Sequence, residues 1–309
     1  GSEGGKRPNG DEAKWEEVRP NTGTLNAMIE AWAHSPNSGD LKKVVDLLEK
    51  MERDYEKTGD ERTKPNIRTV NQVINAYAKK GTESWSGPGE VGDEGGYGKG
   101  NERAWAAAKK AEKLLMKALK TYAETGDESM KPDAATYTSC CDAYSRVGDV
   151  AASERAERLL EQMESQYNET GDPQVRPNFR TYTAVITAWS KTYDDRSPGR
   201  AEDILRHMEL LYADALENGV KFGREDSPKP NVRTYTTVIN AWARSKYPDK
   251  HQRTLRILKK MIDLQKGGDE SAKPNLYTYN ACMEACSRCR GDGAEQSKAL
   301  KIAFAVNKA

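Results

Sequence analysis

The sequence predicts an all-α fold in which helix-turn-helix repeats stack into an α-solenoid, and two observations support this. One motif occurs six times: a Pro, an Asn or Asp, a Thr-Tyr pair or a close variant, an apolar run and an Ala. The intervals between the copies are 45, 67, 45, 53 and 44 residues, and the copies open at Pro20, Pro65, Pro132, Pro177, Pro230 and Pro274. A period of about 45 with two insertions is typical of arrays whose units bury their apolar faces against their neighbours.

The second observation is the helical spacing of apolar residues within each copy. In the clearest copy, Asn178 after Pro177 is a natural N-cap, and apolar side chains follow at Tyr182, Val185, Ile186 and Trp189. We expect this first helix in every repeat. Since Cys282 and Cys286 occupy the positions of Val185 and Trp189 in the sixth copy, we interpret them as core residues.

A second helix follows in each repeat. In the third copy its apolar residues are Ala156, Leu159, Leu160, Met163 and Tyr167, and the fourth copy matches them. A Gly-Asp pair then predicts the end of the helix, at Gly59, Gly126 and Gly171.

These patterns give the expected domain organisation. Residues 1–19 are expected to be a disordered segment, and the solenoid covers 20–309. Its repeats are 20–64, 65–131, 132–176, 177–229, 230–273 and an incomplete 274–309, with a Gly-rich loop at 81–100 inside the second. A phosphate-binding loop at 95–100 is excluded, because Asp93 stands where Gly is needed and no Ser or Thr follows Lys99. We expect the chain to be a fragment, since it has no initial Met and ends within a predicted helix.

Composition limits the function classes only in part. The chain of 309 residues is 36% hydrophobic with a mean hydropathy of -0.90, which suits a thin solenoid better than a large globule. No segment approaches the roughly 18 apolar residues of a membrane span. Lys+Arg 49 against Asp+Glu 48 gives a net charge of +1, so only the placement of charges can indicate a nucleic-acid partner.

An α-helix turns by about 100° per residue. With this angle, two columns of cations fall on the face of the first helix opposite its apolar residues. The first, the cation column, holds one residue from each repeat: His34, Lys79, Arg146, Lys191, Arg244 and Arg288. The second, the arginine column, holds Arg68, Arg180 and Arg233, with Gly23, Ala135 or Tyr277 in the other repeats. Cations one repeat apart can follow a phosphate backbone. The alternative is that they cap the first helices against their dipoles.

A third column on this face, the reader column, contains only small hydrogen-bonding residues. Its members are Asn26, Asn71, Thr138, Thr183, Thr236 and Asn280. Such side chains suit the reading of base edges; the alternative is that they are neutral residues near a helix start. We expect the fold to be indifferent to them, because they lie away from the apolar columns.

Chemistry of other kinds is not indicated. Cys282, Cys286 and Cys289 resemble a zinc set, but core positions explain the first two, and Cys140 and Cys141 also replace core residues. The three histidines lie in different repeats without a nucleophile or carboxylate pattern beside them. We therefore expect no catalytic residues, metal, cofactor or small-molecule substrate, and no enzyme activity in this chain.

The repeated Thr-Tyr opening and the Pro-Asn or Pro-Asp junction resemble those of the pentatricopeptide repeat family, over about residues 20 to 305. The resemblance implies a right-handed superhelix of helix pairs that binds single-stranded RNA at one base per repeat, read by two or three side chains. It also implies an organellar role, in mitochondria or plastids, in RNA processing, stability or translation. Two features depart from the family: the repeats exceed its usual length of about 35 residues, and Arg replaces an aliphatic residue that wedges between bases.

If the family's reading scheme applies, each base is read by a reader-column residue together with the Asn or Asp that follows the next Pro. The implied bases are a pyrimidine, a uracil, three adenines and a pyrimidine, or Y-U-A-A-A-Y. The pairs are Asn26 with Asn66, Asn71 with Asp133, Thr138 with Asn178, Thr183 with Asn231 and Thr236 with Asn275, followed by Asn280 alone.

Two other interpretations stay open at this point. One is a protein-interaction scaffold of the tetratricopeptide type, whose face or loops bind a peptide or protein. The other is the RNA-binding arm of an enzyme whose catalytic domain lies outside this chain.

Overall fold

The computed structural model describes residues 20–288 except 36, 38, 81–98 and 224–225, together with 297 and 301. Every regular element in these ranges is a helix and none is a strand, which confirms the all-α prediction. The expected N-terminal segment, most of the Gly-rich loop and the second helix of the sixth repeat lie outside the described residues. None of the described helices combines the length and the apolar character that crossing a bilayer requires.

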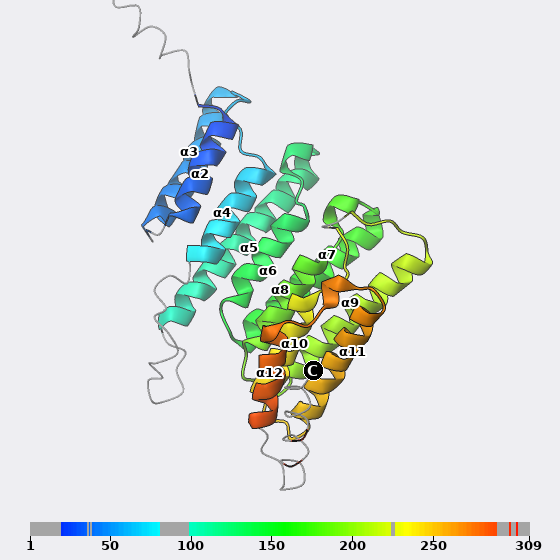
Figure 1. Ribbon diagram of the computed structural model, residues 1–309. Coiled ribbons are helices and arrows are strands. Elements are labelled where there is room, and N and C mark those ends of the chain that lie inside the picture. The colour runs from blue at the N-terminus through cyan, green and yellow to red at the C-terminus, as the bar shows by residue number, and fades with distance from the viewer. Residues whose placement is uncertain are drawn as a thin grey trace, which may run out of the picture.

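The helices alternate between two layers (Figure 1). The first-helix layer consists of α2 (Thr22–His34), α4 (Ile67–Lys80), α6 (Ala134–Ser145), α8 (Phe179–Ser190), α10 (Val232–Arg244) and α12 (Leu276–Ser287). The second-helix layer consists of α3 (Asp40–Thr58), α5 (Lys99–Thr125), α7 (Val150–Thr170), α9 (Ser197–Glu217) and α11 (Lys250–Lys266). Each first helix packs on the next first helix, and each second helix packs on the first helices of its own and the following repeat. This arrangement is an α-solenoid.

The Pro-Asn or Pro-Asp junctions are helix N-caps. The Oδ1 atom of Asn178 accepts hydrogen bonds from the backbone N–H groups of Arg180 and Thr181 at 3.0 and 3.3 Å. In α6, α10 and α12 the Thr at the third helical position also reaches back to the backbone of the cap residue, which completes a capping box. The start of each first helix is thus fixed by residues that the sequence repeats.

The predicted apolar columns form the core. Tyr182, Val185, Ile186 and Trp189 are at most 2% exposed. On the second helix of the third repeat, Ala156, Leu159, Leu160 and Met163 are buried as well, and Tyr167 is half-buried. Cys140, Cys141, Cys282 and Cys286 are buried within the same core, where desolvation raises the pKa values of the thiols of Cys140, Cys141 and Cys282. Cys289 lies outside the described residues.

Second helices end as the Gly-Asp pairs predict. Gly59, Gly126 and Gly171 have φ angles of 64°, 66° and 64°, a left-handed conformation that glycine adopts without strain. The Asp that follows caps a short 3-10 turn, as Asp127 does for Glu128–Met130 and Asp172 does for Pro173–Val175. A Lys from the end of the preceding repeat pairs with this Asp: Lys64 with Asp127 at 3.0 Å and Lys131 with Asp172 at 2.8 Å.

Ion pairs also join neighbouring second helices. A Glu on one second helix binds both an Arg on the next second helix and the large aromatic side chain of the next first helix. Trp189 Nε1 donates to Glu157 at 3.0 Å, and Arg200 forms an ion pair with the same carboxylate. We call each such trio a Glu bridge; the three bridges are Glu112 with Tyr144 and Arg155, Glu157 with Trp189 and Arg200, and Glu202 with Trp242 and Arg253.

The Glu bridges join the second repeat to the third, the third to the fourth and the fourth to the fifth. In the first repeat Val45 occupies the position of the Glu, and in the fifth repeat Leu255 does. The two outermost interfaces between repeats therefore lack the bridge that fixes the three central ones.

One boundary expectation needs correction. The sequence places the Gly-rich loop at 81–100, but α5 already begins at Lys99. Lys99 and Gly100 therefore belong to the first turn of a helix that continues to Thr125. Residues 81–98 lie outside the described part of the chain.

Candidate nucleic-acid interface

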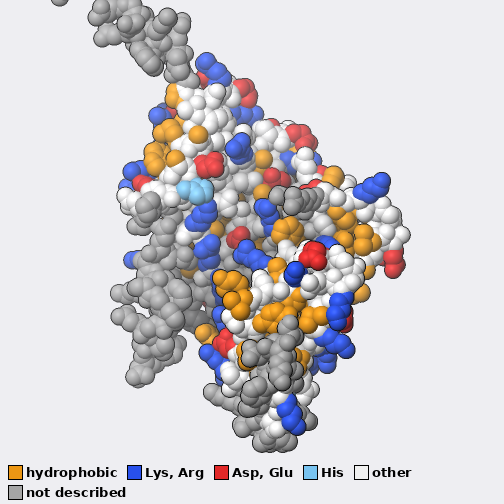
Figure 2. Space-filling model, in the orientation of Figure 1, with side chains coloured by type: hydrophobic (Ala, Val, Ile, Leu, Met, Phe, Trp, Pro, Cys, Tyr) orange, Lys and Arg blue, Asp and Glu red, His pale blue; other side chains and the backbone are white. Residues whose placement is uncertain are grey.

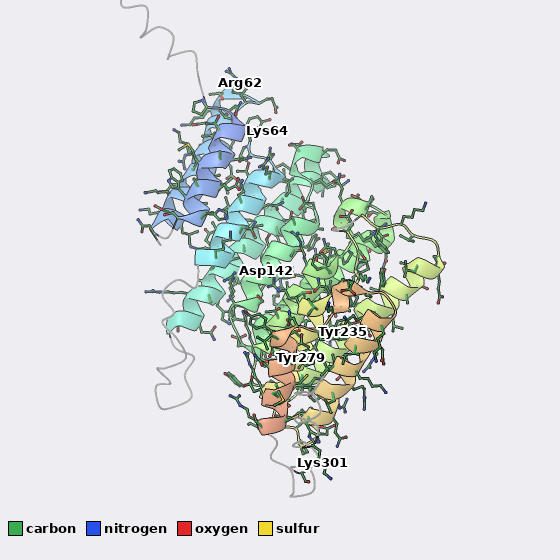
Figure 3. The ribbon with its side chains drawn as sticks, viewed as in Figure 1. Arg62, Lys64, Asp142, Tyr235, Tyr279 and Lys301 are labelled. Carbon is green, nitrogen blue, oxygen red and sulfur yellow. The ribbon has the colours of Figure 1, made fainter. Side chains whose placement is uncertain are left out.

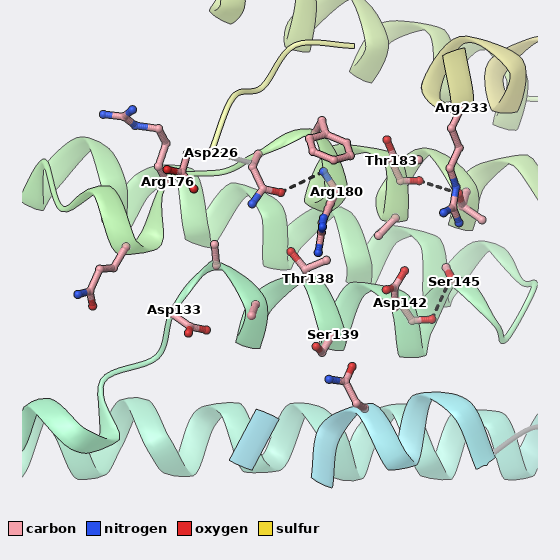
Figure 4. A pocket seen from close by; sticks show the side chains of 18 of the residues that line it. Asp133, Thr138, Ser139, Asp142, Ser145, Arg176, Arg180, Thr183, Asp226 and Arg233 are labelled. Atoms are coloured by element: carbon pink, nitrogen blue, oxygen red, sulfur yellow. Dashed lines mark hydrogen bonds between the residues drawn. The ribbon is translucent and has the colours of Figure 1, made fainter. Parts of the chain in front are cut away.

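A groove of about 1020 Å³ crosses the first-helix layer at the third and fourth repeats (Figure 4). Its lining comes from α4, α6, α8 and α10 and from the junctions between repeats. Four of the predicted reading residues (Asp133, Thr138, Asn178 and Thr183) and four of the predicted cations (Arg146, Arg180, Lys191 and Arg233) lie in it. The columns identified in the sequence thus meet on one surface.

The predicted reading pairs are connected by hydrogen bonds. Thr183 Oγ1 lies 2.8 Å from Thr234 Oγ1, and Thr234 Oγ1 lies 3.3 Å from Oδ1 of its cap residue, Asn231. The same three-residue link joins Asn26 to Asn66 through Thr69, Thr138 to Asn178 through Thr181, and Thr236 to Asn275 through Thr278. In the second repeat the link is direct, since Asn71 Nδ2 donates to Asp133 Oδ1 at 3.1 Å.

The expectation that the fold is indifferent to the reader column is wrong. Asn26, Thr183 and Thr236 are only 4%, 5% and 9% exposed. Consecutive first helices pack directly on one another, so this column lies at the seam between repeats and bonds to the Thr of the next capping box. Asn280 is exposed and makes no such bond to any described residue.

The cap geometry determines what each junction residue can offer to a ligand. Capping uses Oδ1, so an Asn retains its Nδ2 hydrogens as donors. In Asp133, Oδ1 already accepts from Asn71, from the backbone N–H of Thr136 and from Thr136 Oγ1. The other carboxylate oxygen, Oδ2, remains as an acceptor. The second repeat therefore differs in hydrogen-bonding character from the repeats that carry a Thr with an Asn.

The cation column lies at the C-terminal ends of the first helices. Arg146 and Lys191 are C-cap residues, and Arg244 is the last residue of α10. Within the described part of the chain, their side chains make no hydrogen bond to a helix carbonyl and no ion pair at contact distance. In the orientation of Figure 2, Lys and Arg side chains gather along the hollow in the middle of the viewed face.

The two ends of the cation column have partners. His34 lies between the carbonyl oxygen of Glu30, 2.8 Å from Nδ1, and Nζ of Lys79, 2.9 Å from Nε2. Arg288 forms an ion pair with Glu284 at 2.9 Å. Among the described contacts of the cation column, the one that the helix-dipole interpretation requires is found at His34, whose ring binds a carbonyl of its own helix.

Electrostatics show that the central cations act on one another. Lys191 is exposed, but the atoms of the groove reduce its solvation, which lowers the pKa of its ammonium group. Arg146, Arg244 and Arg233 lower it further, whereas Asp142 raises it. Cations from three consecutive repeats therefore form one positive cluster.

The arginine column is exposed in all three repeats that carry it, at Arg68, Arg180 and Arg233. The guanidinium of Arg180 lies 5.8 Å from the centre of the Phe179 ring. Arg233 reaches from α10 toward α6 across the groove (Figure 4).

Besides Asp226, sequence reasoning missed two charged groups of this groove. Arg176 lies over the rings of Tyr167 and Phe222 at 5.0 and 5.5 Å. It occupies the place before the Pro where other junctions carry Lys64, Lys131, Lys229 and Lys273, a pattern that could have indicated it. Asp142 is the other, and it stands one helical turn before Arg146. Among the residues with described positions, no three His, Cys, Asp or Glu side chains are grouped as metal ligands would be.

Comparison with known proteins identifies the repeats. Residues 224–288 match the model of the pentatricopeptide repeat domain, and this segment holds two copies of the motif that recurs from Pro20 onward, those that open at Pro230 and Pro274. This segment is similar to the pentatricopeptide repeat domain. Pentatricopeptide repeat proteins are, in general, RNA-binding repeat proteins. No curated protein matches this chain.

A solved structure is also similar to this chain. The crystal structure of the pentatricopeptide repeat protein PPR10 from maize aligns over 97% of this chain and 36% of that chain. The sequence identity is 20% and the TM-score is 0.43.

Proposed function

We propose that this chain binds single-stranded RNA in a sequence-selective manner, with one base at each reading pair and the phosphate backbone along the cation column. The observation that carries the proposal is the groove of the first-helix layer, in which reading pairs and cations lie side by side. Base edges must be unpaired to reach the seams between repeats, so single strands are the expected ligand.

The preferred sequence under this proposal is Y-U-A-A-A-Y, read from 5′ to 3′ along the chain. The second repeat, with Asn71 and the spare acceptor of Asp133, is assigned to uracil. A carboxylate oxygen can accept a hydrogen bond from the N–H of a uracil edge, whereas an Asn amide can donate to an adenine nitrogen. The three central Thr and Asn pairs are assigned to adenine.

The biological setting is part of the same proposal. On the basis of the family resemblance, we propose that the protein works in mitochondria or plastids, where it would act in RNA processing, stability or translation. Protein partners would bind through the loops, and the chain itself would act as a binding module without catalysis.

The test is a binding competition at fixed salt. The protein is titrated with a fluorescent single strand containing Y-U-A-A-A-Y, with a scrambled strand of equal composition, with the corresponding duplex and with the DNA strand. We expect the matched RNA to bind most tightly. Equal affinity for matched and scrambled RNA would refute the base assignment, and the absence of RNA binding would refute the function and favour the protein-scaffold interpretation.

A further inference from the structure

An acidic residue precedes the cation column by one helical turn in only some of the repeats. Glu30, Asp142 and Glu284 hold this position in the first, third and sixth repeats, and Asn75, Thr187 and Asn240 hold it in the others. Residues four apart share one face of a helix, so each acid lies beside the cation of its own repeat. The cation column therefore has two kinds of site, one with an acid beside the cation and one without.

The sixth repeat shows such a pair in direct contact. Glu284 and Arg288 are 2.9 Å apart and both are partly exposed. An anion that approaches Arg288 thus meets a carboxylate already in place. No acid stands at the corresponding positions beside Lys79, Lys191 and Arg244.

Asp142 has a more extensive set of cationic neighbours. It lies near the middle of the array (Figure 3) and projects from α6 into the groove, toward α8 and α10 (Figure 4). Reduced solvation in the groove raises the pKa of its carboxyl group, and Arg146, Arg233 and Lys191 act to lower it. These three cations come from α6, α10 and α8, so one carboxylate acts on the cations of three repeats.

A purely structural role does not account for Asp142. Its backbone carbonyl accepts a hydrogen bond from Ser145 at 2.9 Å, a contact that any residue could make. Within the described residues its carboxylate caps no helix and makes no hydrogen bond. It is exposed to solvent and its distinguishing environment is the positive cluster.

We propose that Asp142 is an internal counter-anion of the RNA groove, whose carboxylate neutralises part of the Arg146, Lys191 and Arg233 cluster and so weakens phosphate binding at the third repeat. This inference rests on the proposed RNA-binding function. Because phosphate contacts carry no base information, this neutralisation lowers the affinity for every RNA sequence alike.

The experiment compares Asp142→Asn with the wild type on the matched and the scrambled RNA over a range of salt concentrations. We expect the variant to bind both strands about threefold to tenfold more tightly, and its log affinity to fall more steeply with log salt, by about 0.7 for one additional phosphate contact on a single strand. The preference for the matched strand is expected to stay the same or decrease, because the gain is independent of sequence.

Two further variants complete the design. Asp46→Asn removes an equal charge from an exposed site on α3, and it should leave the affinity and the salt dependence unchanged. Asn240→Asp introduces an acid beside Arg244 and should weaken binding to both strands by a similar factor.

The outcomes separate the two proposals. If the wild type binds RNA and Asp142→Asn has wild-type affinity and salt dependence, the counter-anion role is wrong and the proposed function stands. The same holds if Asp46→Asn produces an equal gain, because the effect would then reflect net charge alone. A wild type that binds no RNA would overturn the proposed function and this inference with it.

Discussion

The two helix layers use their basic residues differently. In the second-helix layer, Lys117, Arg155, Arg200, Arg253 and Lys260 each pair with a Glu of the preceding repeat. In the first-helix layer, the central cations Arg146, Lys191 and Arg244 have no contacting carboxylate among the described residues. Because a paired cation stabilises the stack and an unpaired one is left to attract a ligand, we expect the basic residues of the second-helix layer to hold the repeats together and the central cations of the first-helix layer to bind a ligand.

The largest expected effect comes from reversing three cations of the first-helix layer. Lys79→Glu, Lys191→Glu and Arg244→Glu together should reduce affinity for every RNA by at least about three orders of magnitude, since each charged hydrogen bond contributes about 1.5–3 kcal/mol. The melting temperature should change little. The free energy of unfolding falls by about 0.3–1 kcal/mol per site if the interaction of that cation with a helix dipole is lost. Titration with matched and scrambled RNA and a thermal melt provide both readouts. A variant that melts far lower yet binds normally would assign these cations to the stack.

The next effect concerns base selectivity at one reading pair. Thr183→Asn with Asn231→Asp gives the fourth repeat the pair that the second repeat already carries at Asn71 and Asp133. We expect the preferred base to change from adenine to uracil, with a mismatch worth about 1–3 kcal/mol. The fold should tolerate the pair, because the new amide can bond directly to the new carboxylate as it does in the second repeat. Binding of RNAs that differ only at this base measures the change, and an unaltered preference for adenine would disprove the register.

A Glu bridge provides the opposite test, in the second-helix layer. Arg200→Ala leaves Glu157 as a partly buried carboxylate without its cation, and we expect a loss of about 1–3 kcal/mol in the free energy of unfolding with unchanged RNA affinity. Arg256→Ala is the control, because Arg256 is an exposed residue of α11 that forms no ion pair with a described residue.

This loss should depend on pH. Burial raises the pKa of Glu157, and Arg200 and Trp189 lower it. Without Arg200 the pKa of Glu157 in the folded protein rises further. The variant is therefore fully destabilised at pH values above that pKa, and the loss of stability shrinks as the pH falls toward the ordinary pKa of Glu. Denaturant unfolding of both proteins at several pH values checks this, and a destabilisation that grows toward acidic pH would contradict it.

The smallest effect concerns the junctions between repeats. Lys131→Ala removes the hydrogen bond that lowers the pKa of Asp172, and the pair is worth at most about 1 kcal/mol because it is partly exposed. A carboxyl group whose pKa is lowered by folding stabilises the fold at pH values above its ordinary, unfolded pKa. This stabilisation is lost as the pH falls through the pKa that the group has in the folded protein. The stability difference between wild type and variant should therefore vanish in acid. Urea unfolding at neutral and acidic pH measures it, and a difference that persists at low pH would assign Lys131 another role.

The sequence predicted the helices and the core well because these depend on local patterns. The Pro-Asn junction, the spacing of Tyr182, Val185 and Trp189 and the Gly at Gly171 each act through their own helix. The pairing of reader-column residues with cap residues was proposed from the family resemblance, and the hydrogen bonds between Thr183, Thr234 and Asn231 link those residues physically.

What the sequence could not give depends on packing between repeats. The burial of Thr183 follows from the direct contact of α8 with α10, which helical periodicity alone does not reveal. The Glu bridges join residues far apart in sequence on different helices, such as Glu112 and Arg155 at 43 positions, and the influence of Asp142 on Lys191 and Arg233 crosses three repeats. Such contacts become visible only when the repeats are placed side by side.

The comparison between the layers is tested most directly by the salt dependence of RNA binding. The slope of log affinity against log salt is measured for the wild type, for Lys79→Glu with Lys191→Glu and Arg244→Glu, and for Lys117→Glu with Arg200→Glu and Lys260→Glu. Each phosphate contact on a single strand contributes about 0.7 to the slope, so the first variant should lose about 2 and the second should keep the wild-type slope wherever it remains folded. Equal losses in both variants, or a loss only in the second, would contradict the assignment of RNA binding to the first-helix layer.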